Sequence, residues 1–226
     1  MIFDLLPLAL LGGVLGLDVV SFPQAMISRP LVAATLTGAL LGHPTSGLII
    51  GAALELIALE TLPFGASRYP EWGSASVVGG AIFSTHATQS AGGMTMGVLG
   101  ALATAWIGGW TMVKLRQLNA RWAAARRDAL DAGSRRAVVS LQLAGLTADF
   151  VRGAALTVIA YAALAPLADA SVYLWQTDAR VSRAVIVATA ASVAAGAAWK
   201  LFHSTAGARW FFLGGLALGL LMLVRH

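Results

Sequence analysis

Cysteine is absent from this 226-residue sequence, and charged residues make up only 11% of it. The absence of cysteine excludes disulfides, thiolate metal sites and cysteine nucleophiles. Charge is scarce beside a hydrophobic fraction of 58% and a mean hydropathy of +0.78, so too few polar residues are left to cover a water-soluble domain. The sequence therefore predicts an integral membrane protein.

Motifs for nucleotide binding and covalent catalysis are also missing. The chain contains no G-x-x-x-x-G-K-[ST], G-x-G-x-x-G or G-x-S-x-G, so it shows no means of binding a nucleotide phosphate or forming an acyl-enzyme. Its four histidines are His43, His86, His203 and His226, and none has metal-ligand spacing. We expect no catalytic residue, no metal site and no cofactor.

The apolar runs are long and continuous, which indicates membrane helices and not the alternating strands of a barrel. The first run, residues 5–17, lacks a preceding basic region and is interpreted as part of the fold and not as a signal peptide. Regular spans are predicted at 92–113, 151–167, 181–201 and 206–224, the last three with a basic residue near one end that snorkels to the interface. The fold class is an all-α polytopic membrane protein.

Basic residues are concentrated in one segment, because seven of the fifteen lie between Lys114 and Arg136. Lysine and arginine near short spans resist translocation, so this segment is predicted to be a cytoplasmic loop that contains an amphipathic helix. Its charge then sets topology, with anionic-lipid contact as a minor addition. Nucleic acid is not an expected partner.

The N-terminal half is interrupted where the C-terminal half is regular. The breaks read SFPQ, SRP, GHPTSG and LPFGASRYPEWG, and each apolar run between them is about half the length of a span. Such runs are typical of half-helices or re-entrant hairpins, which in transporters surround the binding site. We expect one membrane domain, 1–226, with a broken-helix half (1–110), a basic loop (111–137) and a C-terminal half (138–226).

Polar residues at these breaks are the candidate ligands. Glu55 is an ionisable residue within an apolar run, and its carboxylate suits a sugar because it accepts hydrogen bonds from two hydroxyls. Arg29 lies between two prolines and is the obvious ion-pair partner of Glu55, so the two are predicted to lie close together beside a cavity. Gln24 is the other favoured ligand, and Trp72 is a further candidate. Glu60 lies on another helix face, so no carboxylate pair for hydrolysis is indicated.

The region from Leu17 to Gly80 carries a family resemblance. Asp18 is followed by QAMISRPLV, TGALLG, TSGLIIGAALEL and PFG. This order resembles the membrane subunit IIC of the mannose/fructose/sorbose family of the bacterial phosphotransferase system (PTS). The C-terminal half is similar in layout, with WKLFHSTAGARWFFLGG placed like the last connection and span of that family.

The resemblance implies a IIC subunit that is not itself an enzyme. Such a subunit lies in the bacterial inner membrane, pairs with a IID membrane subunit in an oligomer, and carries a hexose or amino sugar. Cytoplasmic IIA and IIB proteins relay the phosphoryl group to the sugar. On this hypothesis Gln24, Arg29 and Glu55 bind sugar hydroxyls together with Gly65 and Ser67 of the LPFGAS turn.

Four positions depart from the pattern of that family: His43, Glu60, Arg68 and Glu71. They leave the transport class intact and the choice of substrate open. One alternative is a membrane sensor or regulator derived from a IIC, and another is a sugar facilitator that does not couple transport to phosphorylation. A transporter of a different polar solute is a third.

Overall fold

The computed structural model describes residues 2–59, 68–86, 90–175, 177–203 and 207–224. All regular structure in these residues is α-helical, which confirms the predicted all-α class. The helices are α1 (Ile2–Asp18), α2 (Pro30–Leu40), α3 (Pro44–Ala58), α4 (Trp72–Thr85), α5 (Ala91–Ala124), α6 (Arg127–Asp131), α7 (Arg135–Leu174), α8 (Ala179–His203) and α9 (Ala208–Val224).

Short helices make up the N-terminal half. α2, α3 and α4 have 11, 15 and 14 residues, fewer than the roughly 20 that cross a bilayer. Pro30 and Pro44 begin α2 and α3, positions at which proline is tolerated because the first helical N–H groups have no partner within the helix. That these helices enter and leave the bilayer on the same side stays a prediction.

Helix α4 lies at the centre of the fold. Its residues from Trp72 to Ser84 are buried, and it packs against α1, α2, α3, α5 and α7. Small side chains make this possible: a Cβ on Gly79 would lie only 2.8 Å from the carbonyl oxygen of Gly97 in α5. The backbones of α4 and α5 therefore approach each other closely.

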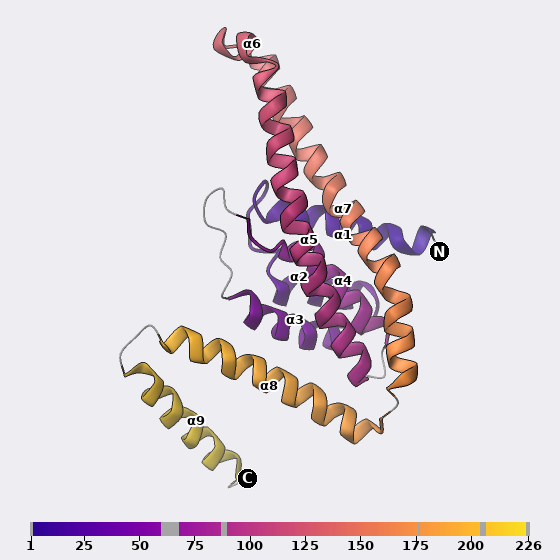
Figure 1. The fold of residues 1–226 in the computed structure, drawn as a ribbon, viewed down its shortest axis with the longest axis vertical. Helices are drawn as coiled ribbons and strands as arrows, with labels where there is room; N and C mark the ends of the chain where they lie inside the picture. Colours follow the sequence, from indigo (N-terminus) through magenta and orange to yellow (C-terminus); the bar gives the residue numbers. More distant parts are fainter. Residues whose placement is uncertain (1, 60–67, 87–89, 176, 204–206, 225–226) are drawn as a thin grey trace.

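Helices α5 and α7 form a long hairpin with α6 at its tip (Figure 1). The predicted basic loop, 111–137, is mostly helix, because α5 continues to Ala124 and α7 begins at Arg135. Helix was expected within this segment, and α5 extends so far into it because no proline or glycine interrupts residues 114–124. At the other end of the hairpin, α8 packs on α3 and α5, and α9 contacts α8.

Three helical segments among the described residues are long and apolar enough to cross a membrane. They are α5, α7 and the first eighteen residues of α8, Ala179–Gly196. The predicted spans 92–113 and 151–167 lie within α5 and α7.

Candidate functional site

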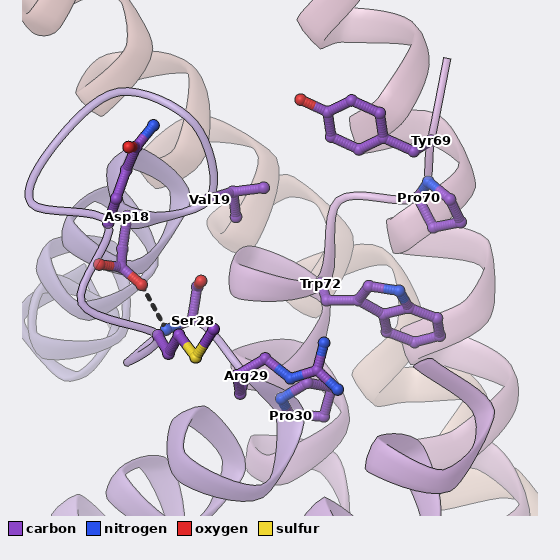
Figure 2. A pocket seen from close by; sticks show the side chains of 10 residues that line it. Asp18, Val19, Ser28, Arg29, Pro30, Tyr69, Pro70 and Trp72 are labelled. Carbon is purple, nitrogen blue, oxygen red and sulfur yellow. Dashed lines mark hydrogen bonds between the residues drawn. The ribbon is translucent and has the colours of Figure 1, made fainter. Parts of the chain in front are cut away.

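The connection between α1 and α2, residues 19–29, is held by the buried carboxylate of Asp18. One carboxylate oxygen accepts a hydrogen bond from the Ala25 N–H at 2.6 Å. The other accepts one from the Ser28 N–H at 2.8 Å, drawn as a dashed line in Figure 2. Gln24 and Met26 have φ angles of +59° and +61°, the left-handed region that non-glycine residues seldom adopt. The two bonds from Asp18 offset that cost and fix the path of the chain.

Arg29 and Glu55 lie in direct contact, as predicted. The Arg29 Nε–H donates to Glu55 Oε1 at 2.8 Å, and Arg29 Nη2 donates to the same oxygen. The second oxygen, Glu55 Oε2, accepts a hydrogen bond from the Leu31 N–H at 3.2 Å. Glu55 therefore satisfies a backbone donor in the first turn of α2 from the neighbouring helix α3.

A cavity of about 340 Å³ lies beside this pair. Asp18 lines it from the end of α1, and Gln24, Ser28 and Arg29 line it from the α1–α2 connection. Tyr69 and Pro70 line it from the segment before α4, and Trp72 from the first position of α4 (Figure 2). The cavity is at the small end of the range for small-molecule sites.

The predicted site residues are distributed unevenly around this cavity. Gln24 and Arg29 line it, as does Trp72, whereas Glu55 is not among the lining residues and pairs with Arg29. The Gln24 side-chain amide donates to the Val20 carbonyl oxygen at 2.6 Å. Gly65 and Ser67 lie outside the described residues, so their expected role stays a prediction.

Tyr69 is held in the cavity wall by a cation. Arg116 of α5 donates from Nη2 to the Tyr69 hydroxyl at 2.6 Å, and its guanidinium lies 5.0 Å from the centroid of the tyrosine ring. The cavity thus combines guanidinium, amide and hydroxyl groups with aromatic rings. Planar donors beside apolar faces suit a neutral polyhydroxylated solute.

A buried charge cluster between α7 and the start of α4 was not predicted from the sequence. Arg152 of α7 donates from Nε to Asp149 Oδ1 at 2.9 Å, and its Nη1 lies 3.9 Å from Glu71 Oε2. The three side chains are at most 9% exposed. The expectation that the basic residue at this end of the 151–167 span snorkels was therefore wrong, because two buried carboxylates attract Arg152 inward. Asp149 and Arg152 are an acid and a base three residues apart at the start of an apolar run, and this spacing could have predicted their ion pair from the sequence.

The four departures from the family pattern have different surroundings. Glu71 caps α4, where its carboxylate accepts a hydrogen bond from the Ser74 N–H at 3.1 Å. His43 is exposed at the start of α3, and Arg68 is exposed against Trp106. Glu60 lies outside the described residues. Within the described part of the chain, no group of three potential ligands could hold a metal ion.

Comparison with known families decides the membership of the chain. The family described as "PTS system sorbose-specific iic component" matches residues 2–222, nearly the whole sequence. The chain belongs to this family. The resemblance to the membrane subunit IIC of the mannose/fructose/sorbose family, carried by the N-terminal motifs, is thereby confirmed.

Several curated relatives share parts of the sequence. The mannose-specific EIIC component of Escherichia coli K12 is 32% identical over 131 residues, 58% of this chain and 48% of that protein. The sorbose-specific EIIC component of Lacticaseibacillus casei is 44% identical over 50 residues, 22% of this chain and 18% of that one. The fructose permease IIC component of Bacillus subtilis is 42% identical over 55 residues, 24% and 20% of the two chains. The matched part spans less than half the length of each relative.

Solved structures share the fold over the whole chain. One, described only as a membrane protein, has a TM-score of 0.69 and 23% identity, covering 100% of this chain and 94% of that one. A second is the mannose transporter ManYZ in complex with microcin E492, with a TM-score of 0.62 and 24% identity over 100% and 93% of the two chains. At these identities the likeness supports the arrangement of the helices alone.

Proposed function

We propose that this IIC component carries a hexose or an amino sugar across the bacterial inner membrane through the cavity at Arg29. A IIB protein then phosphorylates the sugar at the cytoplasmic face after receiving the phosphoryl group from IIA. A IID subunit completes the transporter in the membrane. The family membership supports the transport class, and the cavity beside the Arg29–Glu55 pair is the observation that carries the site.

Arg29 and Gln24 are the proposed direct ligands. The guanidinium of Arg29 has several donors in one plane, and the pair with Glu55 uses only the side of the fork that carries Nε and Nη2. The remaining donor faces are suited to sugar hydroxyls. Gln24 supplies an amide oxygen as acceptor, and Gly65 and Ser67 of the neighbouring segment are proposed to complete the site.

Glu55 is proposed to act mainly through Arg29. Both of its oxygens already accept hydrogen bonds, one from Arg29 and one from the Leu31 N–H. Its negative charge fixes the guanidinium and lowers the cost of holding a cation away from water. This assignment makes the ion pair a preorganised part of the site.

The test is sugar uptake in proteoliposomes that contain the chain with its IID partner and with IIA and IIB supplied on the cytoplasmic side. We expect labelled hexose or amino sugar to accumulate as the sugar phosphate. We expect Glu55→Gln to abolish accumulation while co-purification with IID is retained, and Gln117→Ala, on the exposed surface of α5, to be unchanged. Uptake by Glu55→Gln at the wild-type rate refutes the site.

The same assay separates the alternative functions. Uptake of free sugar without phosphorylation indicates a facilitator. Sugar binding without any uptake indicates a sensor or regulator, and a direct binding panel of hexoses, amino sugars and other polar solutes identifies a different substrate class.

A further inference from the structure

Arg68 and Trp106 form an exposed contact next to the cavity. The Arg68 guanidinium carbon lies 4.3 Å from the centroid of the Trp106 ring, and its Nη2 donates to the Trp106 carbonyl oxygen at 3.2 Å. The tryptophan is 66% exposed although it lies in an apolar helix. A cation and an aromatic face are thus presented together at the outer surface of α5.

The same pattern recurs one turn further along α5. Trp110 is 51% exposed, and Lys114 Nζ lies 5.5 Å from the centroid of its ring. Residues spaced by four differ by about 40° around a helix, so Trp106, Trp110 and Lys114 form one stripe. We call these three residues with Arg68 the tryptophan–cation stripe.

Among the described residues, no acidic side chain neutralises the charges of the tryptophan–cation stripe. Neither Arg68 nor Lys114 forms an ion pair with any carboxylate in the described part of the chain. Arg116, the next cation on α5, faces Tyr69. The stripe therefore attracts an anion.

The position of the stripe along α5 corresponds to a membrane interface. At 1.5 Å per residue Trp110 lies about 30 Å from the start of the helix at Ala91, which equals the usual hydrocarbon thickness. Leu99 and Ala103 continue the stripe toward that start and are exposed and apolar. Along α5 the surface therefore changes from apolar through aromatic to cationic. This order complements the acyl chain, the interfacial region and the anionic headgroup of a phospholipid.

A small cleft completes the arrangement. It has a volume of about 190 Å³ and is lined by Arg68, Tyr69, Pro70 and Trp106. Tyr69 and Pro70 also line the cavity at Arg29, so the cleft and the cavity share one wall. The cleft is too small for a drug-sized ligand but accommodates a headgroup phosphate.

We infer that the tryptophan–cation stripe is a binding site for an anionic phospholipid, with the headgroup phosphate in the cleft at Arg68. Arg68 and Lys114 provide the charge, the two tryptophans lie at the level of the glycerol backbone, and an acyl chain follows Leu99 and Ala103. The inference does not depend on the identity of the transported solute.

The test measures lipid retention by the full chain in detergent with native mass spectrometry. The probes are phosphatidylglycerol and phosphatidylcholine of equal chain length. We expect phosphatidylglycerol to be retained preferentially, and Arg68→Ser and Lys114→Gln each to weaken its binding about fivefold. Arg68→Lys keeps the charge and should retain the preference.

The control is Arg127→Gln, which removes one positive charge from the 82%-exposed side chain on α6 and should leave the preference unchanged. Equal retention of both lipids by the wild type, or undiminished retention by Arg68→Ser and Lys114→Gln, overturns the inference. Displacement of phosphatidylglycerol by inorganic phosphate also overturns it, because the site then binds a soluble phosphate. A variant that fails to fold is recognised by its elution on size exclusion, and if Arg68→Ser fails in this way, Lys114→Gln against Arg127→Gln decides.

Discussion

Glu55 in α3 binds the residues at the start of α2 with both carboxylate oxygens, accepting from Arg29 Nε at 2.8 Å and from the Leu31 N–H at 3.2 Å. One carboxylate therefore satisfies a backbone donor and fixes a cation that lines the cavity. Its two functions can be separated by substitution at Arg29.

On the proposed function, Arg29→Lys should weaken sugar binding while the fold is kept. An ammonium still pairs with Glu55 but lacks the planar fork, so one side chain cannot bond to the carboxylate and to sugar hydroxyls in the same geometry. We expect about a tenfold rise in the dissociation constant, as one or two hydrogen bonds to a charged group are lost. Titration calorimetry measures this, and unchanged affinity together with unchanged stability contradicts the role of the guanidinium.

Asp18→Asn should destabilise the connection between α1 and α2. Both carboxylate oxygens accept from backbone N–H groups, and an asparagine replaces one of them with an amide that cannot accept. The expected loss is about 1–3 kcal/mol of unfolding free energy, measured by thermal unfolding in detergent. Asp131→Asn on α6, whose side chain is 73% exposed, should change stability by less than about 0.5 kcal/mol.

Arg152→Met should be among the most damaging substitutions in the chain. It leaves the buried carboxylates of Asp149 and Glu71 without their cation, which costs about 3–5 kcal/mol. The matched substitution Arg127→Met breaks an exposed pair with Asp131 and should cost less than about 1 kcal/mol. Similar losses for the two variants, measured from denaturation curves, contradict a buried cluster.

Gly79→Ala tests the close approach of α4 and α5. The added Cβ would lie 2.8 Å from the Gly97 carbonyl oxygen, a backbone atom that cannot turn away. We expect a loss of about 1–3 kcal/mol from overpacking. Gly196→Ala in α8 meets no atom within 4 Å and should stabilise its helix by up to about 1 kcal/mol. If both variants unfold at the wild-type temperature, the result contradicts the close packing of α4 against α5.

Ala132→Cys tests the orientation predicted from the basic segment. The natural chain has no cysteine, so the introduced thiol is the only target for a membrane-impermeant maleimide. Ala132 is exposed and has an ordinary helical φ, whereas the adjacent Gly133 has a φ of +69° that a cysteine there would strain. We expect no labelling in intact cells and full labelling after lysis. Labelling before lysis would place the basic segment outside the cell and contradict the predicted orientation.

Much of the helical layout follows from local sequence patterns. The prolines at 30 and 44 mark the starts of α2 and α3, and continuous apolar runs predict α5 and α7. Arg29 and Glu55 could be paired from sequence because two opposite charges in a short apolar region have few other partners. A helix was predicted within the basic segment, but its continuity with α5 and α7 was not, because a charged helix and a solvated loop are similar in composition.

The buried residues of the site were harder to predict because their partners are distant in sequence. Arg152 reaches Glu71 across more than seventy positions, and the Ser21 hydroxyl donates to Asp149 across 128. Asp18 was identified as the first residue of the family motif. Its hydrogen bonds to the Ala25 and Ser28 N–H groups could not be predicted, because the sequence does not specify the path of the turn that brings them together. Tyr69 was overlooked because an aromatic residue between a basic residue and a proline resembles an ordinary loop.

The wall formed by Tyr69 and Pro70 has a practical consequence for biochemistry. Two residues separate the cavity at Arg29 from the cleft at Arg68, and the outer cleft is open to whatever amphiphile surrounds the protein. Tyr69 and Pro70 then contact detergent after extraction and native lipid in the bilayer. On the proposed function, solute affinities measured in detergent and in a bilayer are therefore expected to differ, and the detergent should be varied in binding measurements.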